Sequence, residues 1–249
     1  MSKIGWCDDT VNIMWGCLNN CEYCISRKIA KLRGKYIGKI REYNDIIINK
    51  MINFEPVIFP EWDKIFDKKC KSKKPKKIFM NMMSDIYYWP EDLIEKVLDK
   101  IKQYPQHTFQ FLSKDSYSYH NYPFYYFPKN CWLGITITKE TDLKNVSHRF
   151  IYSNSNITFL SIEPILERIK PQLINSLNIN WVIIGAESGK RKNKVIPKRE
   201  WIEEIGNYCR NNKIPVYLKD SIIKLYPDLA FEYPNYHKFP GFYDKKEKG

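Results

Sequence analysis

Short apolar runs alternate along this chain with segments in which apolar residues recur every three or four positions. The runs are rich in β-branched and aromatic residues and almost continuously apolar, as parallel strands covered on both faces should be. Strands that alternate with helices indicate parallel βαβ units with right-handed crossovers. The predicted strands span residues 11–15, 77–83, 108–113, 132–138, 157–162, 181–186 and 216–220.

Helical patterns occupy the segments between these runs. Residues 90–103 begin with a proline, carry acidic residues in the first turn, and space Leu93, Val97 and Ile101 four apart, which predicts an amphipathic helix. Residues 197–213 repeat this plan. Weaker patterns cover residues 26–34, 140–151 and 164–177, the last interrupted by Pro171.

The order of elements predicts an α/β fold, with a partial (β/α) barrel of about six to seven parallel strands as the leading architecture. A complete barrel and a doubly wound open sheet are the alternatives. We find no internal repeat and no Gly/Ser linker, so residues 1–249 are expected to form one domain. In each of these architectures the site lies at the C-terminal ends of the strands.

Composition narrows the class of protein and of partner. Hydrophobic residues at 43% and aromatic residues at 15% indicate a globular chain rather than a disordered one. No apolar run reaches the roughly 18 to 20 residues of a membrane span, and the N-terminus lacks a secretory signal, so we expect a cytoplasmic protein without a membrane partner. Lysine and arginine exceed the acidic residues by 41 to 28. This excess attracts polyanions such as nucleic acid, although an AT-rich genome also favours lysine codons.

Three of the seven cysteines, Cys17, Cys21 and Cys24, form the pattern C-x3-C-x2-C after the first predicted strand. An odd number of cysteines fits a disulfide framework poorly and favours reduced thiols. Three thiolates on one loop can bind three irons of a [4Fe–4S] cluster and leave the fourth iron without a protein ligand. Zinc is the alternative, but a structural zinc site needs four ligands, and only Cys7 lies nearby in the sequence.

The spacing of the cysteines, with Tyr23 as the aromatic residue before Cys24, resembles the signature of radical S-adenosylmethionine enzymes. In that superfamily the open iron of a [4Fe–4S] cluster chelates S-adenosylmethionine, and one electron cleaves it to a 5'-deoxyadenosyl radical that removes hydrogen from the substrate. The resemblance therefore implies both cofactors and an external one-electron donor.

A closer resemblance runs along nearly the whole chain. The segments "FMNMMSDIYY", "PQHTFQFLSKD", "CWLGITIT", "FLSIEPIL", "WVIIGAESG" and "VYLKD" resemble, in that order, a little-characterised family of radical S-adenosylmethionine proteins common in phages and mobile elements. That family is distantly similar to spore photoproduct lyase, which repairs a thymine lesion in DNA. The segment "VNIMWGC" departs from the family pattern because it lacks a proline before the cysteines.

The resemblance also implies positions that bind the cofactor. Ser84 and Asp85 stand where the superfamily holds the methionyl amino group, although a helix cap is the alternative role. Lys114 is expected either to pair with the cofactor carboxylate or to lie in solvent. Polar groups for the ribose are expected at Thr136, Thr138, Ser161 and Glu163, and the adenine at Gly185 and Glu187. Lys219 ends the last predicted strand, and its partner is left open.

Three further features have two interpretations each. The basic segment 64–77, with eight lysines, is expected to be a solvated loop that either contacts phosphate or is plain surface. The aromatic segment 117–128 either stacks on an extruded base or packs against the barrel. Cys131 either returns a hydrogen atom to a substrate radical or is a buried structural residue.

The sequence thus predicts a radical S-adenosylmethionine enzyme that acts on a nucleic acid base or nucleotide, in modification or repair. A second hypothesis is modification of a protein, peptide or small metabolite. A third is a non-catalytic nucleic-acid-binding module with a structural zinc or a redox-sensing cluster. A partner protein is compatible with each of these functions.

Overall fold

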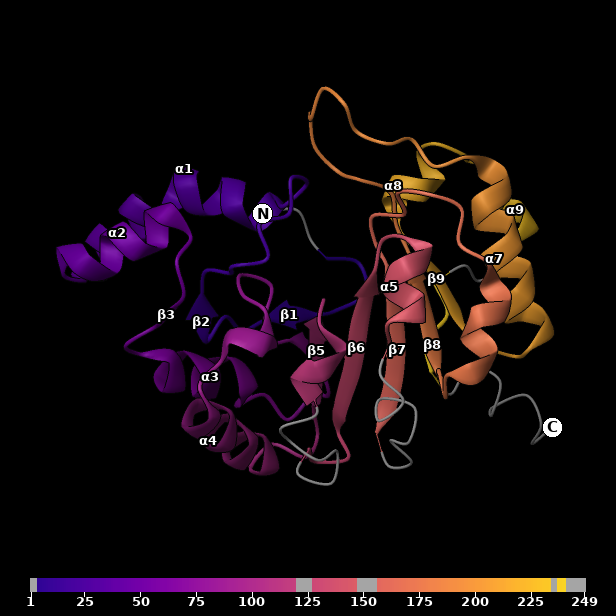
Figure 1. The fold of residues 1–249 in the computed structure, drawn as a ribbon. Coiled ribbons are helices and arrows are strands. Elements are labelled where there is room, and N and C mark those ends of the chain that lie inside the picture. Colours follow the sequence, from indigo (N-terminus) through magenta and orange to yellow (C-terminus); the bar gives the residue numbers. More distant parts are fainter. Residues whose placement is uncertain (1–3, 120–126, 147–155, 234–236, 241–249) are drawn as a thin grey trace. The chain divides into compact units, whose positions relative to one another are not determined.

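The computed structural model describes residues 4–119, 127–146, 156–233 and 237–240. Seven strands belong to one sheet in the order β1-β4-β5-β6-β7-β8-β9 (Figure 1). The order follows the sequence without reversal, and the registered pairs are parallel. A doubly wound sheet reverses its strand order, so the observed order confirms the predicted α/β class with a partial (β/α) barrel. The strands are β1 (Asp9–Thr10), β4 (Lys77–Phe79), β5 (Thr108–Ser113), β6 (Cys131–Ile137), β7 (Ile157–Ile162), β8 (Trp181–Ile184) and β9 (Val216–Leu218).

The chain divides into two compact units, one of residues 7–112 and one of residues 1–6 together with 113–249. The first unit holds α1 (Ile25–Ile40), α2 (Asp45–Asn53), α3 (Trp62–Cys70), the 3-10 helix η1 (Ile86–Tyr88) and α4 (Glu91–Lys102). It also holds a small antiparallel sheet of β2 (Met14–Trp15) and β3 (Val57–Ile58). The second unit holds η2 (Ser116–Tyr119), α5 (Glu140–Lys144), η4 (Pro171–Ser176), α7 (Arg199–Asn211), α8 (Asp220–Ile223) and α9 (Leu229–Glu232).

The strongest helical patterns are confirmed, and one weak pattern is wrong. Helices α4 and α7 lie within two residues of their predicted bounds, and α1 extends past residue 34 to Ile40. Residues 164–177 do not form an α-helix; only the 3-10 helix η4 occurs there, beginning at Pro171. Proline at this position cannot supply the N–H that a continuous helix from residue 164 would need.

The basic segment 64–77 is not the solvated loop that its lysines predict. Its first part belongs to α3, which buries Phe66 and Cys70 on one face and leaves Lys64 and Lys68 exposed on another. Lysine is a good helix former and keeps its charge in water on the exposed face. Only the residues after Cys70 connect the helix to β4 without secondary structure of their own.

The predicted first strand, residues 11–15, is also corrected. The first strand of the large sheet is β1, which pairs with β4, whereas Met14 and Trp15 form β2 and pair with β3 in the small sheet. Between them, Val11 and Ile13 are buried, but residues 11–13 lie in neither sheet. The cysteines therefore follow a strand of the small sheet.

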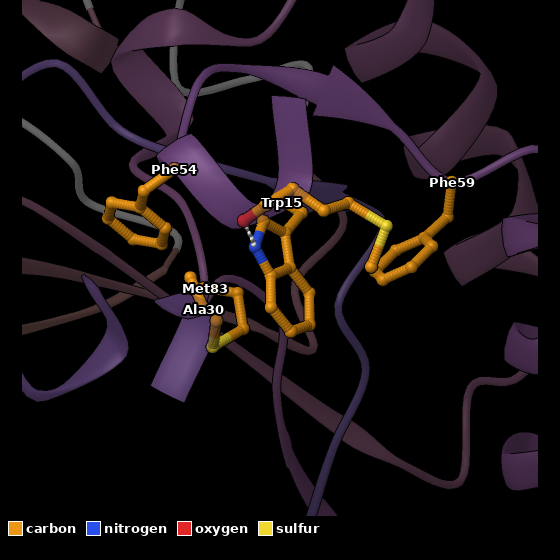
Figure 2. Packing of buried hydrophobic residues seen from close by; sticks show 6 residues of the cluster. Trp15, Ala30, Phe54, Phe59 and Met83 are labelled. Atoms are coloured by element: carbon orange, nitrogen blue, oxygen red, sulfur yellow. Dashed lines mark hydrogen bonds between the residues drawn. The ribbon is translucent and has the colours of Figure 1, made fainter. Parts of the chain in front are cut away.

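A hydrophobic cluster joins the small sheet to the first two helices (Figure 2). Trp15 of β2 packs edge-on against Phe59, with ring centroids 5.6 Å apart. Its indole Nε1 donates a hydrogen bond of 2.9 Å to the carbonyl oxygen of Met51 in α2. Ala30, Phe54 and Met83 complete the buried set, and Cys17 and Cys24 pack against it. The loop that carries the cysteines is thus anchored on this cluster.

The sheet strands of the second unit carry different residues on their two faces. On one face, Gly134, Phe159 and Trp181 are neighbours in register, followed toward the C-terminal ends by Thr136, Ser161 and Ile183. The aromatic part of this face continues through Trp6, which packs against Phe159 and Trp181 at centroid distances of 6.2 and 6.3 Å. The face is therefore aromatic near the start of the strands and more polar near their ends.

Candidate functional site

Gly16 controls the direction of the chain just before the first cysteine. Its φ of +98° lies in the region that favours glycine, and a Cβ at this position would come within 2.1 Å of the carbonyl oxygen of Glu55. Its N–H donates to the carbonyl oxygen of Met83 at 2.9 Å, and the N–H of Cys17 donates to that of Phe54 at 3.1 Å. These backbone contacts fix where the loop begins.

The three cysteines of the pattern are half-buried, and none forms a disulfide. They lie on one loop, residues 17–24, between β2 and α1. Cys24 is the N-cap of α1, and its Sγ accepts a hydrogen bond of 3.3 Å from the N–H of Arg27. A helix N-terminus carries a partial positive charge, so the third cysteine lies where a negatively charged group is held favourably.

A single side chain connects the cysteine loop to the segment after β4. The amide of Asn19 donates from Nδ2 to Oδ2 of Asp85 at 2.8 Å. Its Oδ1 accepts a hydrogen bond of 2.8 Å from the hydroxyl of Tyr88. Both polar atoms of Asn19 are therefore engaged by one segment that lies 66 or more residues further along the chain, and this holds the middle of the loop in place.

Both negative and positive groups lie close to Cys17. Burial raises the pKa of Cys17 to about 11, and the nearby charges of Asp85, Cys21 and Cys24 also raise it. On the other side, Arg27 donates from Nη2 to the carbonyl oxygen of Cys17 at 3.3 Å, and its guanidinium lies 5.2 Å from the ring centroid of Phe54. The Cys17 thiol, whose pKa is raised in this way, would be stabilised as a thiolate by a bound cation.

The loop presents three thiols as candidate metal ligands. In the described part of the chain, no group of three or more His, Cys, Asp or Glu side chains is close enough to hold one metal ion. A [4Fe–4S] cluster binds each thiolate through a different iron, so its three thiolates do not converge on one point. The cysteine loop supplies three reduced and accessible thiols of this kind.

Ser84 and Asp85 lie beside the cysteine loop, and both have partners in the protein. Ser84 forms a parallel bridge with Gly16, and its Oγ accepts a hydrogen bond of 2.9 Å from Nε1 of Trp89. Asp85 caps η1 through Oδ1, which accepts from the N–H of Tyr87 at 3.1 Å. The capping role considered for Asp85 is therefore present, in addition to its hydrogen bond to the loop.

Tyr23 and Lys114 are half-buried. Tyr23 lies in the turn just before α1, and Lys114 directly follows β5 in the second unit.

The second unit brings several of the predicted site residues together. Gly185 lies between the side chains of Glu163 and Lys219, because a Cβ at residue 185 would come within 3.0 Å of both. Nζ of Lys219 donates to Oε1 of Glu163. On the same face, Thr136 and Ser161 are neighbours in register and both are buried. We call these five residues the polar layer, and it lies at the C-terminal ends of β6 to β9.

One atom of the polar layer lacks a hydrogen-bond partner. The hydroxyl oxygen of Ser161 is buried, and within the described residues nothing donates to it or accepts from it. A buried hydroxyl without a partner costs free energy, so its presence marks a place where a bound molecule can supply the partner. Thr138 does not share this property, since its N–H and Oγ1 both donate to Oδ2 of Asp142, at 2.8 and 2.7 Å.

Two further candidates, Glu187 and Cys131, are not part of the polar layer. Both carboxylate oxygens of Glu187 accept hydrogen bonds of 2.8 Å from the guanidinium of Arg191, and the Glu187 side chain is almost fully buried. Cys131 begins β6, at the opposite end of the strand from Thr136, and it is fully buried. Burial raises the pKa of its thiol. This position favours the structural interpretation of Cys131.

The aromatic segment is described only at its ends, because residues 120–126 lie outside the described residues. Tyr119 is buried, and its hydroxyl donates to the carbonyl oxygen of Gly134 at 3.0 Å. Its ring packs edge-on against Phe127, with centroids 6.0 Å apart, whereas Tyr117 is exposed. The two buried rings fit the packing interpretation at both ends of the segment.

Sequence reasoning missed the residues that hold the loop in place. These are Asn19 within the loop and, outside it, Arg27 and Tyr88, which form hydrogen bonds with the loop. None of the three was a candidate. The available signal was the polar Asn19 between Cys17 and Cys21, but its partners lie far away in the sequence.

No helix in the described residues is long and apolar enough to cross a membrane.

Comparison with known proteins gives one match. Neither the curated proteins nor the solved structures contain a match to this sequence. Residues 1–222 match the pattern of DUF5131, a family described as a protein of unknown function. The matched region includes the cysteine loop, the segment after β4 and the polar layer. The chain therefore belongs to the DUF5131 family.

Proposed function

We propose that this protein is a radical S-adenosylmethionine enzyme that acts on a nucleic acid base or nucleotide. The cysteine loop carries the proposal: it presents three reduced, half-buried thiols in the C-x3-C-x2-C spacing at the N-terminus of a helix. With S-adenosylmethionine, a [4Fe–4S] cluster on these thiols would supply a radical that removes hydrogen from the substrate.

The protein's own residues would bind and orient the cluster. Cys17, Cys21 and Cys24 would be its ligands, and Tyr23 would pack beside them. Asn19 would fix the loop through Asp85 and Tyr88. Arg27 would offset negative charge at the loop through its contact with the carbonyl oxygen of Cys17. The remaining contacts of the methionyl group would fall to Ser84, Asp85 and Lys114.

For the polar layer we propose contacts with the ribose and adenine of S-adenosylmethionine. Support comes from the unsatisfied hydroxyl of Ser161 and from Gly185, which leaves room for close approach of a ligand beside Glu163 and Lys219. Thr136 adds a second hydroxyl on the same face. Glu187 would act through Arg191, to which it is paired.

The substrate class rests on charge and on the resemblance to a DNA-repair lyase. A formal net charge of +13 attracts polyanions. An external electron donor is part of the proposal. Reduced thiols and an oxygen-sensitive cluster fit the cytoplasm, which we propose as the location.

The test is formation of 5'-deoxyadenosine. The protein is purified without oxygen, reconstituted with iron and sulfide, reduced with dithionite, and mixed with S-adenosylmethionine in the presence and absence of DNA or RNA oligonucleotides. We expect the wild type to give a [4Fe–4S] spectrum and to form 5'-deoxyadenosine. The variant Cys21→Ala should give a weaker cluster spectrum and less 5'-deoxyadenosine than the wild type.

The matched control is Cys209→Ala, which removes a thiol that is buried in α7 and lies outside the loop. It should keep the cluster and the product. A wild-type protein that assembles a cluster but releases no 5'-deoxyadenosine with either nucleic acid would contradict the proposal. Equal loss in the two variants would contradict the assignment of the ligands.

A further inference from the structure

The exposed side of α1 carries a row of lysines that have no partner in the described structure. Helix α1 contains six basic residues and no acidic residue. The row consists of Lys28, Lys31, Lys35 and Lys39, all exposed. In the described part of the chain no carboxylate forms an ion pair with any of them, whereas other exposed lysines, such as Lys96 and Lys102 of α4, do have acidic partners.

The spacing of the row places its charges on one side of the helix. Its members are three or four residues apart, which is about 4.5 to 6 Å along the axis and keeps them within a narrow arc. The buried side of α1 is formed instead by Ala30, Gly34 and Gly38, where α2 approaches closely enough that a Cβ on Gly34 would contact the Met51 backbone at 3.2 Å. The lysine row therefore faces away from α2.

An apolar row runs beside the lysines on the same exposed side. Leu32, Tyr36 and Ile40 follow one another at intervals of four, and they are 80%, 68% and 63% exposed. Ile25 continues the row toward the cysteine loop and is also exposed. Large apolar side chains this exposed in a continuous row indicate a contact surface rather than scattered surface residues.

We propose that this face of α1 binds a single-stranded segment of nucleic acid, with phosphates on the lysine row and bases on Tyr36 and its apolar neighbours. Proteins that bind single strands combine a positively charged track with side chains on which bases stack. The chemistry of the two rows matches that combination, and lysines that neutralise phosphates release the counterions condensed on the nucleic acid. A single strand supplies both kinds of group in regular alternation along its length, phosphates for the lysines and bases for Tyr36.

The place of the helix in the chain gives this surface a role. Cys24, the third cysteine of the loop, is the N-cap of α1, so a strand bound along the helix would be led toward the thiols. This inference rests on the proposed function for its choice of nucleic acid as substrate, but binding to α1 is measured without any cleavage of S-adenosylmethionine.

The experiment compares two pairs of substitutions that remove equal charge. Binding of a fluorescein-labelled 20-nucleotide oligothymidylate to reconstituted protein, without S-adenosylmethionine, is followed by anisotropy at several salt concentrations. The variant Lys31→Gln/Lys35→Gln changes the row, and Lys96→Gln/Lys102→Gln changes α4. We expect the first to weaken binding about tenfold or more and to lower the slope of log K against log salt by roughly 1.4, at about 0.7 per lost phosphate contact. The second should match the wild type.

A separate substitution tests the apolar row. Tyr36→Ala should weaken binding about tenfold while leaving the salt slope unchanged, because it removes stacking and no charge. Circular dichroism checks that each variant stays helical. Equal weakening by the two lysine pairs, or none by either, would overturn the proposal.

Two rival occupants have their own outcomes. If the α1 variants lose binding to vesicles of phosphatidylserine and phosphatidylcholine but keep oligonucleotide binding, the face is a membrane contact and the proposal fails. It also fails if sedimentation shows a dimer that Tyr36→Ala dissociates without any effect on the oligonucleotide. Binding that depends on α1 in a protein that makes no 5'-deoxyadenosine would refute the enzyme assignment and leave this surface standing.

Discussion

The cysteine loop is held at residue scale by groups other than its cysteines. Gly16 sets the direction of the chain through a positive φ, and Asn19 joins the loop to Asp85 and Tyr88. Cys24 is a ligand candidate that also has a structural role, as the N-cap of α1. The loop is thus shaped before any metal binds, which lowers the entropic cost of ordering its ligands.

Gly16→Ala should destabilise the fold by more than about 2 kcal/mol, because alanine would have to adopt the left-handed backbone conformation that glycine has at this position. The new Cβ would also overlap the carbonyl oxygen of Glu55, 2.1 Å away. Urea unfolding followed by circular dichroism measures the change. A midpoint equal to that of the wild type would show that the chain relaxes freely at this position.

Asn19→Ala should lower the iron bound per chain after reconstitution, because it removes both hydrogen bonds that fix the middle of the loop. Each neutral hydrogen bond contributes about 0.5 to 1.5 kcal/mol, and those to a charged group more. Tyr88→Phe removes only one of the two and should have the smaller effect. Iron analysis and the rate of thiol modification by a disulfide reagent check both variants in folded protein.

An iron content that is unchanged in Asn19→Ala, with thiols that react at the wild-type rate, would show that the loop needs no support from this side chain. The thiol measurement does not depend on the cluster. It therefore separates a failure of the positioning role from a failure of the proposed cofactor.

Single residues also show what the sequence can and cannot predict about the site. Glu163 and Lys219 end two strands, so parallel-sheet geometry places them at the same edge, and the structure pairs them. The contact between Asn19 and Asp85 depends on the conformation of two loops, which no periodicity records. Lys69 is a similar case, since it was part of a predicted loop and instead reaches Asp9 from α3.

Elements with a strong apolar period are predicted well, and short ones are not. The four-residue spacing of α4 and the apolar face of α7 identify both helices. Strands β1, β2 and β3 have two residues each, which is too short for any alternation. Helix α3 is difficult to recognise in the sequence, because a run of like charges with few apolar residues resembles a solvated loop.

Gly38→Ala should show that α1 and α2 pack through glycine. The added methyl would lie 2.5 Å from Cγ1 of Ile48, and overpacking of this kind costs typically about 1 to 3 kcal/mol, less the gain in helix propensity. Ile48→Ala removes the obstructing atoms. A double-mutant cycle of urea unfolding should give a double variant less destabilised than the sum of the single variants. Simple additivity would contradict direct contact.

The stabilisation that the ion pair between Asp9 of β1 and Lys69 of α3 contributes should depend on pH. Asp9 accepts a hydrogen bond of 2.8 Å from Lys69. Burial raises the pKa of Asp9, but the hydrogen bonds from Lys69 and from the N–H of Thr10 outweigh it, so the pKa is lowered below 3.8. A carboxyl group with a depressed pKa stabilises the fold above its unfolded pKa and loses that contribution as pH falls through its folded pKa.

Asp9→Asn should therefore be less stable than the wild type at pH 7, by no more than about 1 kcal/mol because the pair is partly exposed. The difference should shrink as pH falls below 3.8. Thermal unfolding across this pH range measures it. A difference that is constant with pH would show that the ion pair makes no net contribution.

At the scale of the whole molecule, the α/β class can be predicted from the alternation of apolar runs with helical segments. The strands of the large sheet are also arranged in the order in which they occur in the sequence. The division into two units is not visible in the sequence, since no linker marks it. One unit is a continuous stretch, residues 7–112, whereas the other combines residues 1–6 with residues 113–249. Trp6 supplies the N-terminal piece's contact with the aromatic part of the sheet face.

Trp6→Ala should loosen the second unit and leave the first unit intact. Removing a buried tryptophan costs about 3 to 5 kcal/mol, and its neighbours Phe159 and Trp181 belong to β7 and β8. Hydrogen exchange measured by mass spectrometry should show amides of these strands exchanging at least about tenfold faster. Peptides that cover β4 should be unaffected; faster exchange there would mean that the two units unfold together.

The same discontinuity bears on how the protein is made. A ribosome releases Trp6 long before it has synthesised β7 and β8, against which that side chain packs, whereas residues 7–112 are synthesised as one continuous stretch. The second unit is therefore completed by packing against a segment that was synthesised more than a hundred residues earlier. Expression tags or leader sequences placed at the N-terminus would therefore disturb the last part of the chain to be translated.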